Sequence, residues 1–435
     1  MNNIRKKLLL LFLLMLPWQT RWIFGDVNVM GDISEFGRMA VYAFDIVLVL
    51  FLLVSTHLFS RATFERVKRS KVRLVALGAL SGLVLYSFVT SLWAVQPMVA
   101  LVFSVHMLLG ALLFYVLLVD EEISIDMVLA SIAVGMLVPS LLGWMQSATQ
   151  SIDASTILGM SAQTPDTLGV AVIEHADGRW LRAYGSFPHP NIFGGFLAFG
   201  LISVAAISAR GRMKRKELLL LLTAASLGGA LIMSASRGAW LALVIGLAIF
   251  HFGHRMNKHK EQMKRASGPI FAMATTIVLI ALFMSPVLGS RFDGENRLEE
   301  RSISERTMQV DEAKTLLTRS PILFLTGSGV ANYTFTLQGI KPLQKVFMYQ
   351  PVHNVLALIL VELGLLGFAL FVTFVVATDW EVHKKWQNSN SLIAMSLGAV
   401  ILVVAMTDHY LWTQVSGIYL VAIFFAVNMR LGEEA

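Results

Sequence analysis

The stretch VHNVLALILVELGLLGFALFVTFVVAT, residues 352–378, decides the fold class of this chain. Glu362 is the only residue in it that carries a full charge at neutral pH. A helix of about 20 apolar residues crosses the roughly 30 Å of hydrocarbon in a bilayer. A helix is required because hydrocarbon offers no partner to a bare backbone amide. The sequence therefore predicts a transmembrane helix over 352–378.

Runs of the same kind recur between Leu8 and Val427. By the length rule they predict an all-α, polytopic bundle of about twelve transmembrane helices, forming a single membrane domain over residues 1–435. The predicted spans are 8–24, 39–60, 72–95, 98–119, 123–147, 190–209, 217–235, 238–253, 269–289, 352–378, 391–407 and 411–428.

The composition excludes a soluble domain. Hydrophobic residues make up 56% of the chain and charged residues only 14%, whereas soluble domains carry roughly 25% charged residues. There is no cysteine, so the chain can form neither disulfides nor thiolate metal sites. The formal net charge of +7 could suggest a nucleic-acid partner, but its distribution explains it better.

The basic residues alternate between the loops in the way that sets membrane orientation. If the N-terminus is cytoplasmic, the six inward segments hold 22 of the 35 Lys and Arg residues. These segments are 5–7, 61–73, 210–216, 255–265, 384–385 and Arg430. Because short cytoplasmic loops are rich in Lys and Arg, we expect both termini in the cytoplasm. The charge is then an orientation signal, with the bilayer as partner and no nucleic acid.

Two predicted outward loops are long, 148–189 and 290–351. The second contains ISERTMQVDEAKTLLTRSP (303–321), where apolar residues recur among charged ones. This pattern predicts an amphipathic helix on the membrane surface or capping the bundle, between spans 9 and 10. Gly327-Ser328-Gly329 should end it. No internal repeat is visible, which weighs against a secondary transporter.

Charged residues near the outer ends of spans are the candidate functional groups, since membrane-embedded charges usually face a cavity. Arg182 opens RAYGSFPHPNIFGGF (182–196), which also holds His189 and Asn191. Its prolines predict a rigid turn into the helix, and Gly194-Gly195 allow close approach of a helix or ligand. Arg182 has two equally weighted interpretations, a snorkelling side chain or an anion ligand.

Two further arginines differ in what their surroundings indicate. Arg237 lies in SASRGAWLAL (234–243) between two short apolar spans. An arginine beside small residues and the free amides of a helix start can bind a phosphate, so the pattern favours function over a plain turn. Arg306 lies on the amphipathic stretch, where a charge usually belongs to the solvated face. By pattern alone the solvated face is the favoured interpretation for Arg306.

His353 lies at the outer end of the decisive helix, followed by Asn354. A histidine near a helix end is more often structural, and Asn354 could be a helix cap, yet histidine also suits proton transfer near neutral pH. Glu362 is mid-span and needs a partner. Asp45 and Asp408-His409 in TDHYLWTQ (407–414) are its candidate partners.

The acidic residues form no D-x-D or H-E-x-x-H pattern, and no Walker motif is present. A metal-dependent transferase or a zinc protease is therefore disfavoured, and we expect neither a metal nor a cofactor. Arginines without a metal suit a diphosphate leaving group, whose developing charge they can stabilise.

The chain resembles the O-antigen ligase and polymerase superfamily from about Arg182 to Gly367. The resemblance is carried by RAYGSFPHPNIFGGF, SRGAWLAL, SERTMQ, LTGSGVANY and PVHNVLALILVELGLLG. The resemblance implies a polytopic GT-C-type glycosyltransferase of the bacterial inner membrane with its active site facing the periplasm. Such enzymes move a glycan from undecaprenyl diphosphate to an acceptor hydroxyl, with inversion and without a metal.

The resemblance also implies roles for particular residues. Arg237 and Arg306 match the arginines that bind the diphosphate, which reverses the pattern-based interpretation of Arg306. His353 matches the histidine that acts near the acceptor as general base or activator. The match of Arg182 is looser. We keep it as a candidate substrate-binding residue, together with the following polar residues: His189, Asn191, Asn354, Asp408 and His409.

Several functions remain open at this point. A ligase would use a lipid A core sugar as acceptor, and a polymerase would use the next lipid-linked repeat. Protein O-glycosylation ranks lower, because such enzymes often carry extra length. A transporter of the same lipid is a different class, and it should place charges deep in several spans.

Overall fold

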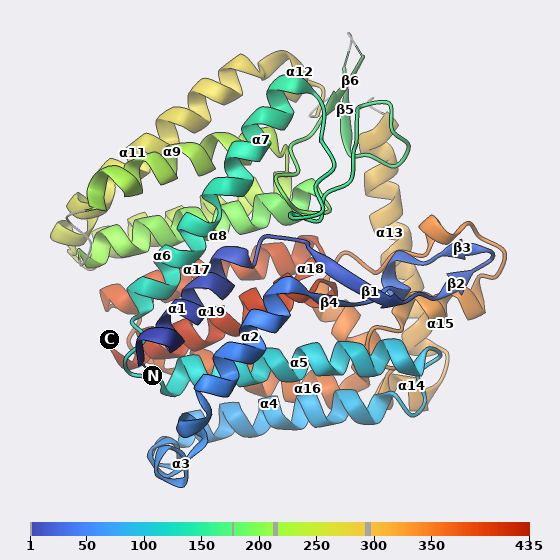
Figure 1. Cartoon of the computed structure of the whole chain (residues 1–435), viewed down its shortest axis with the longest axis horizontal. Coiled ribbons are helices and arrows are strands. Elements are labelled where there is room, and N and C mark those ends of the chain that lie inside the picture. Colours follow the sequence, from blue (N-terminus) through green and yellow to red (C-terminus); the bar gives the residue numbers. More distant parts are fainter. Residues whose placement is uncertain (1, 176–177, 212–215, 292–296) are drawn as a thin grey trace.

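The structure is a computed structural model that describes residues 2–175, 178–211, 216–291 and 297–435. It is a bundle of helices with three short β-hairpins (Figure 1). The helices are α1 (Asn2–Met15), α2 (Ala43–Val54), α3 (Arg61–Lys68), α4 (Lys71–Thr90), α5 (Pro97–Val119), α6 (Ile125–Gly135), α7 (Leu137–Thr149), α8 (Pro190–Arg210), α9 (Glu217–Met233), α10 (Arg237–Met256), α11 (Lys260–Phe283), α12 (Ser285–Gly289), α13 (Arg297–Thr318), α14 (Pro321–Thr326), α15 (Tyr333–Ile340), α16 (Val355–Lys384), α17 (Ser389–Thr407), α18 (Tyr410–Thr413) and α19 (Val415–Glu433). The strands are β1 (Arg21–Gly25), β2 (Asn28–Val29), β3 (Asp32–Ile33), β4 (Met39–Tyr42), β5 (Val172–His175) and β6 (Gly178–Leu181).

Nine helical segments of the described chain are long and apolar enough to cross a membrane, with α6 and α7 counted as one span. The multi-pass prediction is therefore confirmed. Two of the other predicted spans contain only shorter apolar helices, α2 and α9. The basic segment predicted over 210–216 lies partly outside the described residues, as does part of the 290–351 loop.

The predicted span 8–24 is wrong in its second half. The helix α1 ends at Met15, and residues 21–25 form β1. Pro17 explains the end, because proline lacks an amide hydrogen and disfavours helical backbone in the residue before it. β1 pairs antiparallel with β4, which was predicted to be the start of the span 39–60. The all-α prediction thus holds for the bundle and misses the hairpins outside it.

The helix α8 forms the centre of one half of the bundle. Every residue in its apolar 18-residue window is buried. It packs against α6, α9, α10, α11 and α17. A methyl group added at Gly195 would overlap the Tyr410 hydroxyl, and one at Gly194 would lie 2.8 Å from Ser236 Cβ. The glycine pair therefore serves close helix packing, one of the two uses that the sequence suggested.

The helix α16 is broken at Gly364, whose φ of 63° lies in the left-handed region. At this break the backbone amides of Ser328 and Gly329 donate to the carbonyls of Val361 and Glu362, each at 2.9 Å. The loop from 327 to 333 therefore satisfies carbonyls that lose their helical hydrogen-bond donors at the break.

Glu362 is the buried carboxylate at this break. It accepts hydrogen bonds from Ala331 N at 2.9 Å, Tyr333 N at 3.3 Å and Trp412 Nε1 at 2.8 Å. None of the candidate partners named from the sequence pairs with it. Asp45 instead accepts from Tyr42 N and the Tyr419 hydroxyl, and also lies 3.2 Å from His106 Nε2.

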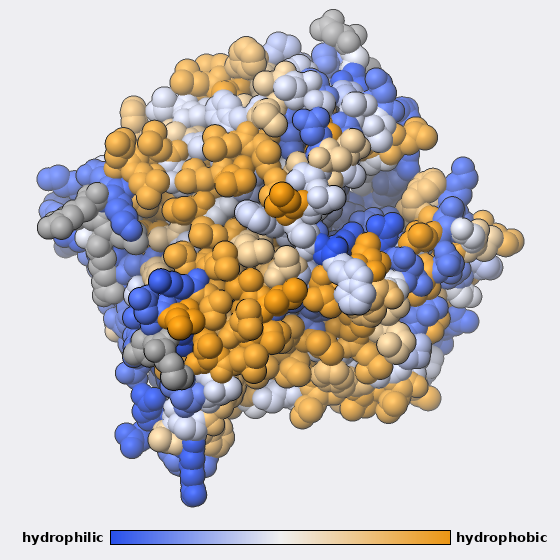
Figure 2. Space-filling model, viewed as in Figure 1, coloured by the Kyte–Doolittle hydropathy of each residue, from blue (hydrophilic) through white to orange (hydrophobic). Residues whose placement is uncertain are grey.

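The two ends of the bundle differ in what they carry. Both termini and α3 lie at one end, and the loop 150–171, the hairpins, α13 and α15 lie at the other (Figure 1). We call these the terminal end and the loop end. Ion pairs such as Arg5–Asp120 at 2.9 Å and Arg210–Asp126 at 2.7 Å hold the terminal end together. An apolar band covers much of the visible face between the two ends (Figure 2). This arrangement agrees with the predicted alternation of loops, while the compartment that each end faces stays a prediction.

Candidate active site

A cavity of about 710 Å³ opens at the loop end. The visible surface has a hydrophilic hollow between the 150–171 loop and the β1–β4 hairpin (Figure 2). The described lining of the cavity contains seven arginines but only three carboxylates. The arginines are Arg179, Arg182, Arg237, Arg291, Arg297, Arg301 and Arg306, and the carboxylates are Glu174, Glu305 and Asp408. Such an excess of positive charge attracts anions. We call this space the basic cavity.

Arg237 begins α10 and is held by a reciprocal pair of hydrogen bonds. Its Nη1 donates to Arg291 O at 3.2 Å, and Arg291 Nη2 donates to Ala235 O, also at 3.2 Å. Ala235 has a φ of 47°, which makes the sharp turn before α10. The N-terminus of α10 adds unsatisfied amides and the positive end of a helix dipole. The sequence analysis missed Arg291, although it lies only two residues after the predicted span 269–289.

Arg306 reaches the cavity from α13, so the predicted amphipathic helix is present. Arg301 pairs with Glu305 at 2.7 Å, and Arg297 pairs with Glu174 at 2.9 Å. The Arg306 side chain is exposed to solvent and also lines the cavity. The pattern-based interpretation as a solvated face is thus incomplete.

His353 is oriented by a residue that the sequence analysis missed. Its Nδ1 lies 2.7 Å from Gln309 Oε1, an oxygen that can only accept. Nδ1 is therefore the protonated nitrogen, and Nε2 keeps its lone pair. Burial lowers the pKa of His353 below its usual value, helped by the Arg306 charge and opposed by Asp408 and Glu305. Gln309 lies one helical turn after Arg306, and this spacing could have identified it.

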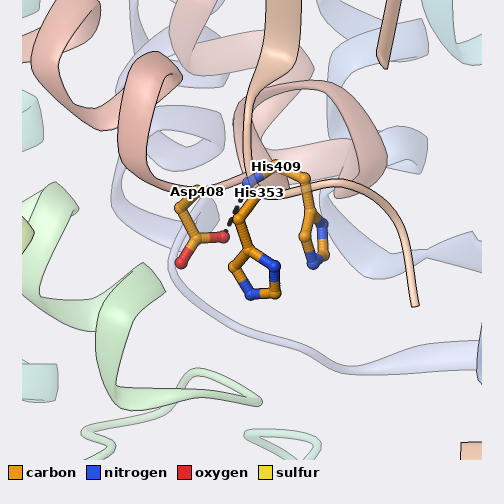
Figure 3. A group of neighbouring side chains, drawn as sticks. All are labelled: His353, Asp408 and His409. Carbon is orange, nitrogen blue, oxygen red and sulfur yellow. Dashed lines mark hydrogen bonds between the residues drawn. The ribbon is translucent and has the colours of Figure 1, made fainter. Parts of the chain in front are cut away.

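His353, Asp408 and His409 form a cluster (Figure 3). The His353 and His409 rings meet edge to face with centroids 5.0 Å apart. The His409 amide donates to Asp408 Oδ1 at 2.7 Å, and Asn191 Nδ2 donates to Oδ2 at 3.0 Å. Burial lowers the pKa of His409 to about 4. Burial alone would raise the pKa of Asp408, but the neighbouring imidazoles and the hydrogen bond from Asn191 outweigh it and lower the pKa.

The same three side chains could hold a metal ion, because their ligand atoms all lie within 4.8 Å of one another. Zinc binds nitrogen at about 2.0–2.1 Å, so ligands of one zinc ion lie roughly 3.4 Å apart. If the ligand atoms of His353, Asp408 and His409 lie close to 4.8 Å apart, these side chains would have to move closer together to bind zinc. The sequence could not indicate this group, since His353 precedes α16 whereas Asp408 and His409 follow α17, more than 50 residues away. The expected absence of a metal therefore stays a prediction.

Arg182, His189 and Asn191 form a chain of hydrogen bonds that leads to Asp408. Arg182 Nε donates to Ser234 O at 2.8 Å, and its Nη2 donates to Asn191 Oδ1 at 2.7 Å. Asn191 N donates to His189 Nδ1 at 3.1 Å, which caps α8. Burial and the Arg182 charge lower the pKa of His189 to about 3, so this imidazole is neutral. All three residues line the basic cavity. The hydrogen bond from Arg182 to Ser234 O also stabilises the turn before Arg237.

Asn354 has the structural role that the sequence left open. Its Oδ1 accepts from Ala357 N at 3.0 Å and caps α16. It does not appear in the lining of the basic cavity. Seven of the nine predicted site residues thus line the basic cavity, His409 lies beside them against His353, and Asn354 is a cap.

Residues 218–372 match a family model described as O-antigen ligase. The resemblance to that superfamily is therefore confirmed for this part of the chain. Members of the family are glycosyltransferase-like O-antigen ligases and polymerases. The matched range contains Arg237, Arg306 and His353, and the remaining cavity residues on α8 and near α18 lie outside it. No curated protein matches the chain.

Proposed function

With residues 218–372 matching the O-antigen ligase family as the premise, we propose that this chain is an O-antigen ligase-type glycosyltransferase. It moves a glycan from undecaprenyl diphosphate to a sugar hydroxyl of the lipid A core. The reaction takes place on the periplasmic side of the inner membrane, inverts the anomeric centre and needs no metal. One observation carries the proposal: a cavity rich in arginines meets a neutral histidine whose Nε2 is available as a base.

In the proposed reaction, Arg237 and Arg306 bind the diphosphate in the basic cavity. His353 Nε2 accepts the proton of the acceptor hydroxyl while the hydroxyl oxygen forms a bond to the anomeric carbon. The bond from this carbon to the diphosphate oxygen breaks, and undecaprenyl diphosphate leaves with the electron pair. Arginines placed where negative charge develops lower the barrier without reorganisation, which is why one such donor is worth about 10²–10³ in kcat.

The Arg237→Ala variant tests this assignment in purified protein in detergent, with undecaprenyl-diphosphate glycan and lipid A core from the host strain. We expect transfer to fall about 100-fold, because the developing diphosphate charge loses one donor. Arg319→Ala is the matched control, since Arg319 is exposed at the loop end outside the basic cavity. Equal rates for Arg237→Ala and wild type would remove Arg237 from the mechanism.

The same assay in excess EDTA tests metal independence. We expect an unchanged rate, because no step requires a Lewis acid. Loss of transfer that returns when zinc or magnesium is added would assign the His353, Asp408 and His409 cluster to a metal instead.

A polymerase that uses the same donor is the alternative, and its acceptor would be the next lipid-linked repeat. The product separates the two, since a ligase makes one transfer to the core and a polymerase makes a ladder of growing chains. Transfer by detergent-solubilised protein, where no compartments exist, would exclude pure transport. The gathering of the arginines and histidines at one end of the bundle favours transfer over transport, because transporter sites lie near the bilayer midplane.

A further inference from the structure

The three side chains of the cluster in Figure 3 come from positions where the backbone can adjust. His353 precedes α16, and Asp408 and His409 connect α17 to α18. One ligand atom from each residue lies within 4.8 Å of the other two, which exceeds the separation of zinc ligands by at most about 1.4 Å. Because none of the three residues is inside a helix, they can close this gap without breaking one.

Each histidine offers a defined nitrogen, because its other nitrogen is engaged. His353 Nδ1 donates to Gln309 Oε1, which leaves the lone pair on Nε2. His409 Nδ1 lies 2.8 Å from Thr413 Oγ1, and that hydroxyl donates its own hydrogen to His409 O at 3.4 Å. The Thr413 oxygen therefore accepts from Nδ1, and His409 also keeps its lone pair on Nε2.

The carboxylate of Asp408 is oriented in the same way. Its Oδ1 accepts from His409 N, and its Oδ2 accepts from Asn191 Nδ2. A carboxylate oxygen has two lone pairs, so each oxygen keeps one for an ion. Histidines and carboxylates that bind a metal almost always have such partners, which fix their tautomer and orientation. The cluster therefore has both the ligand atoms of a metal site and the hydrogen bonds that orient them.

The ligand set indicates which metal fits. Zinc binds sets of two imidazoles and one carboxylate and keeps its fourth position open, whereas magnesium prefers oxygen ligands. Asp408 is buried, but both histidines are half-buried, so an ion can reach them. The arginines of the basic cavity oppose a cation, and the negative charge of Asp408 offsets part of that opposition.

We propose that His353, Asp408 and His409 form a zinc site that inhibits the protein. Zinc in this site takes the Nε2 lone pair of His353, which accepts the hydroxyl proton in the proposed reaction. Zinc binding and proton transfer then exclude each other, so the ion is an inhibitor and not a cofactor. The binding of zinc is independent of the proposed function, whereas the inhibition rests on it.

Zinc binding is measured by calorimetric titration of untagged, metal-free protein in detergent with zinc chloride, and with magnesium chloride for comparison. We expect the cluster to bind zinc but not magnesium, and His409→Ala to lose this zinc. Thr413→Val keeps the side-chain shape but removes the acceptor for His409 Nδ1, and loss of such a partner weakens metal binding about 10–100-fold. Thr336→Val is the matched control, because Thr336 is a half-buried threonine on α15 whose hydroxyl donates to Asn332 O at 2.9 Å. Equal zinc affinity in wild type and Thr413→Val would overturn the proposal.

Inhibition is measured in the detergent assay of glycan transfer. We expect saturating zinc to lower the rate about 100-fold, since a general base contributes about 10²–10⁴-fold, and EDTA to restore it. Without zinc, Thr413→Val should still transfer glycan, and half-inhibition should need about 10–100-fold more zinc than in wild type.

The two assays separate failure of the zinc site from failure of the proposed function. Transfer at the full rate with zinc bound would overturn the inhibitory site alone. Wild-type protein that binds zinc at the cluster but transfers no glycan in its absence would overturn the proposed function, and the inhibition with it, while confirming the zinc site.

Discussion

At the scale of single residues, His353 depends on Gln309 for its chemistry. The amide oxygen of Gln309 accepts from Nδ1, which leaves Nε2 with its lone pair, and in the proposed mechanism Nε2 is the base. A base must be neutral, and burial lowers the pKa of His353 below about 6.5. We therefore expect kcat to be level at alkaline pH and to fall as the pH drops through the lowered pKa of His353, with a midpoint below that of a free imidazole. A pH profile of transfer by the wild-type protein measures this fall in kcat at low pH, which we call the acid limb.

Gln309→Glu tests the link between these two residues. A carboxylate next to the imidazole stabilises its protonated form and raises the pKa of His353. Because a higher pKa leaves less neutral histidine at a given pH, the acid limb should move to higher pH. Gln309→Ala removes the acceptor without adding charge, and we expect about a tenfold loss in kcat, the lower end of the loss seen when the hydrogen-bond partner of a metal-bound histidine is removed. An acid limb that stays in place in Gln309→Glu would exclude His353 as the titrating base.

Local patterns predicted some of these residues and missed others for identifiable reasons. The cap at Asn354 and the turn at Arg237 follow from neighbours in the chain. Gln309 could have been predicted from its helical spacing to Arg306. The partners of Glu362 could not be predicted, because two of them are backbone amides about 30 residues away, and no side-chain pattern identifies a backbone donor.

At the scale of elements, the break in α16 depends on two glycines that approach each other. Gly364 has a φ of 63°, and its added Cβ would meet backbone atoms of Leu325 and Gly327. Gly364→Ala should therefore lose at least about 1–2 kcal/mol of stability from the left-handed backbone alone. We expect a lower Tm in detergent. Gly78→Ala, in the middle of α4 with no atom near its added Cβ, is the control and should keep or slightly raise the wild-type Tm, because alanine favours a helix over glycine.

Element boundaries were predictable where a span is long and uniform. The predicted spans 72–95 and 98–119 correspond closely to α4 and α5. The first span failed because apolar residues around Trp22 and Phe24 were counted as helix, although they belong to β1. Hydropathy measures how apolar a segment is and cannot separate a short strand at the end of a bundle from the last turns of a helix.

At the scale of the whole molecule, the side of the membrane that each end faces can be measured directly. The absence of cysteine means that single-cysteine variants have no background. We expect Ala162→Cys, exposed in the loop-end segment 150–171, to react with an impermeant maleimide in cells whose outer membrane is permeabilised. Ala62→Cys, exposed on α3 at the terminal end, should react only after the inner membrane is opened. The reverse pattern would contradict the predicted orientation and the periplasmic site.

The enclosure of α8 has a consequence for how the bilayer acts on this protein. Its side chains are apolar enough for a lipid-facing helix, yet its whole window is covered by other helices. That apolarity serves insertion, when a segment must partition into hydrocarbon before its neighbours assemble around it. In the finished molecule, thinning or thickening of the lipid strains the outer helices first. The positions of His189 and Asn191, at the start of α8, should therefore depend little on the thickness of the surrounding bilayer.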